Sequence, residues 1–470
     1  MGERTFMDAR DVSALTQRIQ ELEKENARLK EILEKNGIEY ESFESKTCNF
    51  NHIESTSVSI CQFTLQEKVT IFQSVFRGRD DVFAKRWYSS TTQKSGYQPV
   101  CTREWNREFC DKRKYKCADC PNRQFAPLTY NDVFNHLAGK DVWGRDVIGL
   151  YPIRKDNTCC FLCTDFDDKS CEHGYKNDVL SFVNVCKTWN VPCYIERSRS
   201  GNGAHVWIFF DTPITAFKAR KLGNVILTEA MNSDVHLSFK SYDRFFPNQD
   251  TLPEGGLGNL VALPLQGMAR RKGNSVFVDE DFNAYADQWE LLSQIRKLSE
   301  VELDMLLRQH IEPTLGELSK TSEEKPWETP KMDMMPTDCY PKEFVLTRAN
   351  MLYIPLTSLS AKCVNVFKRM AAFRNPEFYE KQGMRLSTYN IPRIISCSEI
   401  TDDYLVLPRG CEDAVRDILT QHNVKVMISD KTNHGRSIKV TFRGGLREEQ
   451  QKAMEAFAEH NIGTLSATTA

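Results

Sequence analysis

The sequence predicts an α+β fold for the central part of the chain, and three observations support this prediction. An apolar run over residues 158–164 is typical of a buried strand, and apolar residues at helical spacing follow over 177–189. A second strand pattern covers 191–196, and a third covers 206–210 after a Gly-rich turn. Strand, helix, strand, turn and strand in this order predict a small mixed sheet with helices on one face.

The segments before this core contain further regular elements. A helix is expected over residues 65–76 and another over 129–137. Thr129 is suited to cap the start of the second helix, and Gly139 lies just past its end. Residues 146–152 are predicted to form a strand that precedes the core.

Paired carboxylates at the end of the first core strand are the strongest chemical signal. Asp165 and Asp167 are two residues apart, so their side chains share one face of a strand. Mg²⁺ and Mn²⁺ bind such carboxylates together with substrate phosphates. The turn before the third strand carries His205, which suits the triphosphate of an incoming nucleotide. Two-metal sites of this kind catalyse nucleotidyl transfer.

This order of an Asp-x-Asp pair, a small-x-His element and a later Asp resembles the archaeo-eukaryotic primase superfamily. Three longer segments, at residues 117–123, 144–149 and 242–250, are similar to the primase domain of TOTE conflict systems. They read CADCPNR, GRDVIG and YDRFFPNQD. The resemblance covers residues 65–310 and implies an RRM-like catalytic core.

The resemblance also implies roles for single residues. Asp243 matches the third acidic position, with Asp250 as the alternative, and Asp165, Asp167 and Asp243 would hold two Mg²⁺ or Mn²⁺ ions. The predicted nucleotide-binding residues are Ser200, Gly201, Gly203, His205, Arg197, Arg199 and Lys272. For the two arginines and the lysine, an ordinary surface charge is the alternative interpretation.

A basic region at residues 101–120 contains four cysteines with zinc-site spacing. They are Cys101, Cys110, Cys117 and Cys120. Four thiolates form a tetrahedral Zn²⁺ site, and the final Cys-x2-Cys is typical of a zinc knuckle. Four unrelated buried cysteines are the alternative. By contrast, Cys159, Cys160 and Cys163 lie in the apolar run, where they are expected to pack as small hydrophobic residues.

Residues 1–36 have the heptad pattern of a coiled coil, and 37–64 are predicted to be a linker. The a and d positions are Val12, Leu15, Ile19, Leu22, Asn26, Leu29 and Leu33. An Asn at an a position often fixes the register of a coiled coil, so a homodimer is expected. A single amphipathic helix that packs on its own domain is the alternative.

Residues 311–341 are rich in proline and predict a second linker, followed by a small α/β module over 342–470. A helix is expected over 412–421 and a strand over 437–442. The module resembles the segment that precedes a superfamily two helicase in TOTE proteins, with Gln450 at a helix start. Since the lysine and threonine of a phosphate-binding loop are absent, we expect a truncated helicase start, no ATPase activity and a helicase module as partner.

Composition agrees with a cytoplasmic, multidomain protein of 470 residues. The net charge is −2, so nucleic-acid binding must depend on local basic patches. No signal peptide or membrane-spanning run is evident, and the 16 cysteines favour reduced thiols. The expected function is a primase-polymerase of a mobile-element or defence system that uses nucleic-acid templates and nucleoside triphosphates. A non-catalytic module that binds nucleic-acid ends and recruits a helicase is the alternative, but three converging carboxylates favour an enzyme.

Overall fold

The computed structural model describes most of the chain from residue 63 onward. The described residues are 24, 25, 28, 35, 63–115, 117, 120–167, 174–237, 239, 241, 244–310, 340–433, 435–459 and 464–466. From residue 63 they all belong to one compact unit, Ser59–Ala470. The predicted coiled coil, both predicted linkers and Asp243 lie wholly or almost wholly outside the described residues.

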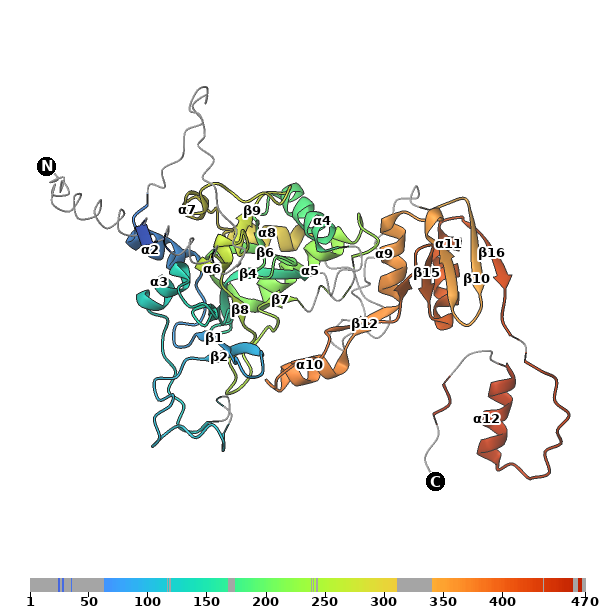
Figure 1. The fold of residues 1–470 in the computed structure, drawn as a ribbon. Coiled ribbons are helices and arrows are strands. Elements are labelled where there is room, and N and C mark those ends of the chain that lie inside the picture. Colours follow the sequence, from blue (N-terminus) through green and yellow to red (C-terminus); the bar gives the residue numbers. More distant parts are fainter. Residues whose placement is uncertain are drawn as a thin grey trace, which may run out of the picture. The chain divides into compact units, whose positions relative to one another are not determined.

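A five-stranded sheet forms the centre of the fold (Figure 1). Its strand order is β7-β4-β6-β5-β9. The strands are β4 (Thr158–Asp167), β5 (Tyr194–Arg197), β6 (Gly203–Thr215), β7 (Phe245–Phe246) and β9 (Val276–Val278). With helices α4 (Tyr175–Thr188) and α5 (Ala216–Ala230), the chain order β4-α4-β5-β6-α5-β7 is the ferredoxin-like β-α-β-β-α-β arrangement.

All the described strand pairs in this sheet are antiparallel, so the predicted mixed sheet is wrong. The crossover through α4 would allow β4 and β5 to pair in parallel. However, β6 lies between them and pairs antiparallel with both. The mixed-sheet prediction failed because pairing depends on which strand enters this space, and local sequence does not specify that.

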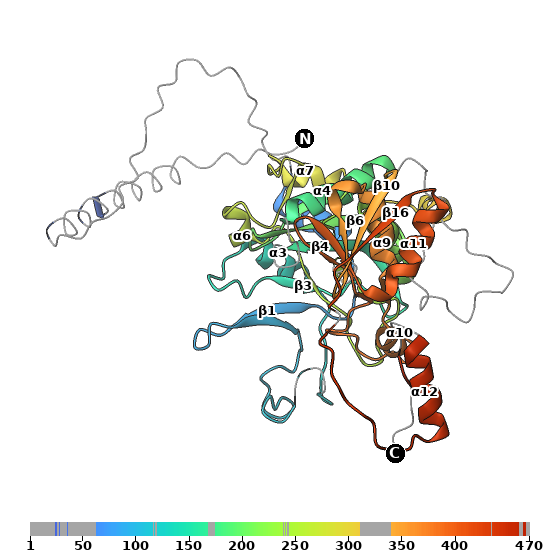
Figure 2. The ribbon, with the colours of Figure 1, turned by 90° about the vertical axis from the view of Figure 1, so that its right-hand side faces the viewer.

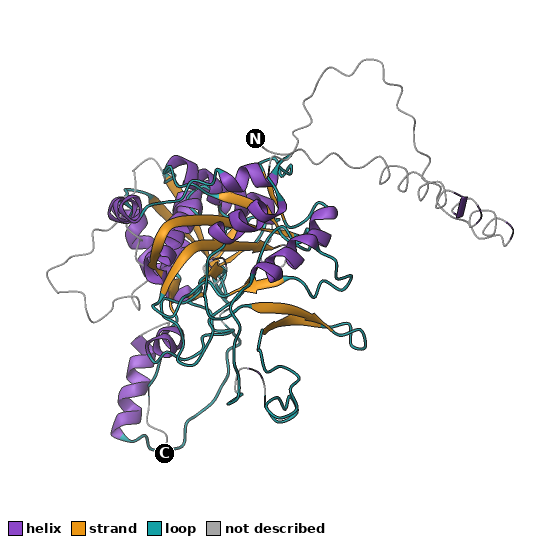
Figure 3. Ribbon diagram, turned by 90° about the vertical axis from the view of Figure 1, so that its left-hand side faces the viewer, coloured by secondary structure: helices purple, strands orange, loops and turns teal. Residues whose placement is uncertain are grey.

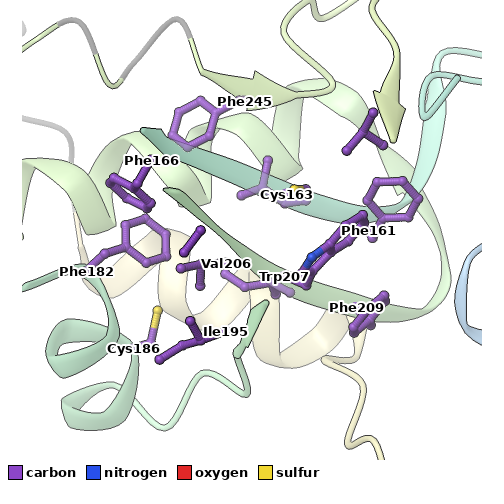
Figure 4. Packing of buried hydrophobic residues seen from close by; sticks show 14 of the residues in the cluster. Phe161, Cys163, Phe166, Phe182, Cys186, Ile195, Val206, Trp207, Phe209 and Phe245 are labelled. Atoms are coloured by element: carbon purple, nitrogen blue, oxygen red, sulfur yellow. The ribbon is translucent and has the colours of Figure 1, made fainter. Parts of the chain in front are cut away.

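Helices pack on both faces of the sheet, and not on one face as the sequence predicted. On one face, Phe182 of α4 contacts Phe166 of β4 with ring centroids 5.9 Å apart (Figure 4). The other face carries Trp207 and Phe209 of β6. Their rings lie 5.3 and 5.6 Å from that of Phe76, the C-cap residue of α2 (Leu65–Val75). This second layer comes from a segment that precedes the core in the sequence.

The two helices predicted before the core are confirmed. A capping box begins α2 at Thr64, and another begins α3 (Tyr130–Ala138) at Thr129. Gly139 ends α3 in the left-handed conformation at a φ of 57°. Inside α3, His136 is fully buried: its Nε2 lies 2.8 Å from the Pro264 carbonyl, and its Nδ1 accepts the Ile148 N–H at 3.1 Å.

A second sheet, of order β2-β1-β3-β8, is formed largely by residues that precede the core. Its strands are β1 (Ala84–Tyr88), β2 (Ser95–Pro99), β3 (Ile148–Leu150) and β8 (Val261–Ala262). The outer part of the β1–β2 hairpin extends beyond β3, which pairs only with the first two residues of β1 (Figure 2). Three helices complete this region, α6 (Gly267–Arg271), α7 (Gln288–Ser293) and α8 (Glu300–Gln309).

The C-terminal module has its own sheet, of order β14-β15-β11-β10-β16 (Figure 1), and Figure 3 colours the helices and strands of the chain by type. Its strands are β10 (Glu343–Arg348), β11 (Leu352–Pro355), β14 (Glu399–Ile400), β15 (Tyr404–Leu407) and β16 (Lys425–Asp430). A two-stranded sheet joins β12 (Ala372–Arg374) and β13 (Ile394–Ser396). The helices are α9 (Ala361–Met370), α10 (Pro376–Gly383), α11 (Glu412–Gln421) and α12 (Glu448–Glu459).

Two of the three predictions for this module are confirmed. Helix α11 has the predicted bounds, and Gln450 lies in the first turn of α12, where its side chain accepts the Arg447 N–H. The predicted strand at 437–442 does not form. Its alternating apolar residues Ile438, Val440 and Phe442 are 70–78% exposed, because no described strand pairs with them.

Buried polar contacts join the module to the core that carries the five-stranded sheet. Arg220 of α5 is 2% exposed and pairs with Asp250, which also accepts from Gln382 of α10 at 2.9 Å. Asn365 of α9 donates to the Thr228 carbonyl at 3.2 Å. None of the described helices has both the length and the hydropathy to span a membrane.

Candidate active site

The register of β4 and β6 brings the paired carboxylates beside the histidine. Asp165 pairs with His205 and Asp167 pairs with Gly203, so the side chains of Asp165, Asp167 and His205 project from the same face. His205 Nε2 lies 3.6 Å from an Asp165 carboxylate oxygen. The side chains of Asp165 and Asp167 are 20% and 30% exposed, at the end of a strand that is otherwise buried. The structure thus brings together the central residues that the sequence predicted.

A cation already lies at the two carboxylates. One guanidinium nitrogen of Arg244 is 3.6 Å from an oxygen of Asp165 and 3.6 Å from one of Asp167. Burial raises the pKa of Asp165 above its usual value, and the charges of His205 and Arg244 offset part of that rise. Because two carboxylates share this position, positive charge is needed there to keep both ionised.

A buried glutamate, Glu196, holds the imidazole of His205 in place. Glu196 lies next to His205 on β5, is 1% exposed, and has a carboxylate oxygen 2.8 Å from His205 Nδ1. The same oxygen accepts the Trp207 indole N–H at 2.9 Å, and the other oxygen lies 3.5 Å from the Ser275 hydroxyl. Burial alone would lower the pKa of His205, but the carboxylates of Glu196 and Asp165 raise it to about 9. A pKa near 9 makes the imidazolium the main form at neutral pH, and its Nε2 faces Asp165.

Sequence reasoning missed Glu196. The sequence places Glu196 at the end of a predicted strand, and a glutamate that closes an apolar strand is a signal for a buried, paired carboxylate. Its position opposite His205 depends on the β5–β6 register, which is a tertiary property.

The glycine turn is shaped by close backbone approach. Gly201 has a φ of 85°, which glycine adopts without strain. A Cβ added at Gly203 would lie 2.6 Å from the Phe166 carbonyl oxygen, so no other residue fits against β4. Ser200 accepts the Asn202 N–H at 3.3 Å and lies 3.1 Å from the Ser198 hydroxyl. The turn is thereby held against the strand that carries the carboxylates.

The three predicted phosphate-binding cations have different positions. Arg197 projects from the opposite face to His205, and its guanidinium donates to the carbonyls of Gly273 and Phe282. The structure therefore does not bring it to the carboxylates. Arg199 is exposed within the glycine turn. Lys272 is exposed at the end of α6, next to the loop that packs on this turn through the Ser275 N–H and the Ser198 carbonyl.

The two candidates for the third carboxylate differ clearly. Asp250 pairs with the buried Arg220, so its charge is already used in a structural contact. Asp243 lies outside the described residues, but the next residue, Arg244, accepts the Asp165 N–H at 3.0 Å through its backbone carbonyl. The chain therefore passes the carboxylate pair directly after Asp243.

The predicted zinc cysteines surround a single small cavity of about 30 Å³. They are Cys101, Cys110, Cys117 and Cys120. Burial raises the pKa of the Cys117 thiol, and the nearby Lys112 ammonium offsets part of this rise. Across the described ranges, no three His, Cys, Asp or Glu side chains are arranged to hold a metal ion, so the thiols converge without forming a closed site. Cys159, Cys160 and Cys163 are buried in β4, as predicted.

Comparison with known proteins gives one informative match. A search of curated proteins finds no significant match. Among solved structures, the polymerase domain from Mycobacterium tuberculosis ligase D in complex with DNA is similar over 52% of this chain and 86% of its own. That likeness has 11% identity and a TM-score of 0.28, too low to support an inference. The TOTE conflict system archaeo-eukaryotic primase domain matches residues 67–306, half of the chain. The chain therefore belongs to the TOTE conflict system archaeo-eukaryotic primase family.

Proposed function

We propose that this protein is a primase-polymerase that synthesises or extends nucleic-acid strands in a mobile-element or defence system. Membership of the family supports a nucleotidyltransferase-type role. The observation that carries the proposal is the position of Asp165 and Asp167 beside His205, 3.6 Å from Asp165 on the neighbouring strand. A protein that only binds nucleic-acid ends has no need for half-buried, like-charged groups at this position.

The donor set fits hard divalent cations. Asp165 and Asp167 supply carboxylate oxygens, which Mg²⁺ and Mn²⁺ prefer, and Asp243 is the proposed third ligand. The approach of Arg244 to both carboxylates supports a strong preference for positive charge at this point. When bound, two such ions would stabilise the attacking 3′-hydroxyl and the leaving diphosphate.

The chain's own residues then bind and orient the nucleotide. His205 donates its Nε2–H to the triphosphate, and such charge-assisted hydrogen bonds are stronger than neutral ones. Ser200 and the backbone of Gly201 to Gly203 surround the phosphates, and glycine allows the close approach. Arg199 and Lys272 add positive charge, whereas Arg197 holds the turn through backbone carbonyls.

The four converging cysteines fit a structural Zn²⁺ ion. Thiolates are the preferred ligands of such sites, and a shared cavity lets their sulfurs converge with small shifts. Zinc would fix a region rich in Lys and Arg, which attracts nucleic-acid phosphates.

Nucleotide incorporation tests the proposal. The protein is incubated with a primed or unprimed DNA or RNA template, Mg²⁺ or Mn²⁺, and labelled dNTPs or NTPs. The wild type is expected to extend or start strands, and Asp165→Ala with Asp167→Ala should abolish incorporation while thermal stability without metal is kept or raised, since repulsion is relieved. Incorporation by the double variant, or none by the wild type under any of these conditions, would contradict the proposal.

A further inference from the structure

A group of basic and aromatic side chains lies beside the glycine turn, and all of its members except Arg199 have no role in the nucleotide site described above. We call it the hairpin platform. It consists of Arg86, Tyr88, Tyr97, Trp143 and Arg199. In the β1–β2 hairpin, Arg86 pairs with Tyr97 and lies two residues from Tyr88, so these three side chains share one face.

Two arginines of the platform meet at Tyr97, which pairs with Arg86 in the hairpin and hydrogen-bonds the Arg199 side chain. Burial lowers the pKa of Arg86, and the neighbouring charge of Arg199 lowers it further. Burial raises the pKa of the Tyr97 hydroxyl, while the guanidinium groups of Arg199 and Arg86 act in the opposite direction. Neither arginine forms an ion pair with a carboxylate in the part of the chain that the structure describes. Adjacent like charges are unfavourable unless an anion binds between them.

The aromatic half of the platform presents a flat, open ring. Tyr88 and Trp143 stack with centroids 4.9 Å apart and an interplanar angle of 11°, and Trp143 is 47% exposed. Arg86 holds this stack in place, because its guanidinium donates to the Trp143 carbonyl at 2.6 Å and lies 5.9 Å from the Tyr88 ring. A stacked pair with one free π face is suited to receive a nucleobase.

We infer that the hairpin platform binds single-stranded nucleic acid, with phosphates at Arg86 and Arg199 and a base stacked on Trp143. A free phosphate or triphosphate would account for the arginines but not for the exposed ring. Arg199 lies in the turn that carries Ser200 and leads to His205, so a strand bound here passes next to the nucleotide site. The inference rests on the proposed function only in assigning this strand as the template.

The aromatic contact is tested by fluorescence anisotropy of a labelled oligothymidine, without nucleotide or divalent metal. Trp143→Ala should raise the Kd about 5- to 150-fold, which is the range for losing one base stack, and Trp143→Phe should restore most of the affinity. Trp143→Leu keeps apolar contact with Tyr88 without a ring, so it tests stacking even where Trp143→Ala unfolds. Tyr389→Ala is the matched control, because Tyr389 is 81% exposed in the C-terminal module.

The phosphate contacts are tested through the salt dependence of the same binding. Arg86→Ala with Arg199→Ala should lower the slope of log K against log salt by about 1.4, since each single-strand contact contributes about 0.7. Arg308→Ala, on the exposed side of α8, is the charge control and should leave the slope unchanged.

Two results would overturn the inference. In one, the Trp143→Leu and double-arginine variants bind the oligonucleotide as the wild type does. In the other, they raise only the KM for nucleotide, which would assign the platform to the incoming nucleotide. The inactive Asp165→Ala, Asp167→Ala variant should still bind through the platform, so a wild type that binds strands but incorporates no nucleotide would reject the proposed function and keep this inference.

Discussion

Glu196 links β6 to the segment before β9 through one buried carboxylate. It contacts His205 and Trp207 on β6 and the Ser275 hydroxyl before β9. A buried carboxylate that is paired and hydrogen-bonded is costly to disturb, because its partners lose their counter-charge. Under the proposed function, Glu196 is a positioning residue that would act on the nucleotide through His205.

Glu196→Gln tests this role at nearly constant volume. The amide cannot favour the imidazolium as the carboxylate does, so the pKa of His205 should fall from about 9 toward its ordinary value. The KM for nucleotide should rise about tenfold at pH 8, with less change at pH 6.5 and a smaller effect on kcat. Steady-state kinetics across this pH range provide the measurement.

Two comparisons complete the Glu196 test. His205→Ala should raise the KM at both pH values, and Ser275→Ala, which removes only the 3.5 Å contact, should behave like the wild type. An equal KM for Glu196→Gln and the wild type at pH 8 would show that Glu196 is only structural.

At the scale of elements, buried side chains fix how helices and loops meet the sheets. His136 joins α3 to β3 and to the Pro264 carbonyl before α6, with one ring nitrogen donating and the other accepting. Only the neutral imidazole can make both contacts. Burial lowers the pKa of His136 to about 4.

This pKa predicts a window of acid sensitivity. His136 takes up a proton near pH 6.5 in the unfolded chain but only near pH 4 in the folded chain. Protonation therefore favours unfolding between these values, and the folded protein keeps its full stability from this group only above pH 6.5. This contribution to the free energy of unfolding should fall by about 3 kcal/mol as the pH drops from 6.5 to 4. His136→Gln keeps a donor and an acceptor without titrating, so denaturant unfolding of this variant should depend less steeply on pH. An identical dependence in both proteins would contradict the prediction.

The zinc proposal belongs to the same scale. A purified preparation should contain one Zn²⁺ per chain by elemental analysis, and Cys117→Ser should lose it. Chelation should then loosen residues 101–120 in hydrogen exchange and weaken nucleic-acid binding, without unfolding the core. Cys163→Ser, a buried cysteine of β4, is the control and should keep the metal. A metal-free wild type that binds DNA normally would exclude the site.

These examples show which features the sequence specifies. Helices α2 and α3 were predictable because their capping boxes and apolar spacing are local, and α11 because its apolar spacing is local. The Asp-x-Asp pair and His205 were predictable because their chemistry is carried by short segments. By contrast, the insertion of β6, the partnership of Glu196 and the orientation of Arg197 depend on strand register. The exposed segment 437–442 has the alternating apolar pattern of a strand but does not form one, because this pattern alone does not supply a partner strand.

At the scale of the whole molecule, the C-terminal module contacts the core through polar groups as well as through apolar residues such as Ile394. Lys368 of α9 donates to the Leu237 carbonyl at 3.1 Å, and Arg393 lies near Asp250. Burial and the charge of Arg393 lower the pKa of Arg220 to about 10, and Asp250 offsets part of this effect. Asp250 is therefore the residue that neutralises a cationic junction between two parts of the chain.

Asp250→Ala should strongly destabilise this junction. Removing one partner of a buried pair leaves an uncompensated charge, which costs about 3–5 kcal/mol. We expect a lower free energy of unfolding and faster proteolysis between core and module, while the metal-dependent chemistry is kept in protein that remains folded. Asp279→Ala, at an exposed turn, is the control. Unchanged stability in Asp250→Ala would show that the junction does not depend on this pair.

The same junction has a consequence for synthesis on the ribosome. The contact between Thr228 of α5 and Asn365 cannot form until the chain has been extended by 137 residues beyond Thr228. At about 5–20 residues per second, that interval is roughly 7 to 27 seconds. A large apolar surface that stayed uncovered for this time would promote aggregation of the nascent chain. On the core side of this junction, Arg220, Thr228 and Asp250 carry polar groups that water can bind until translation supplies the segment that covers them.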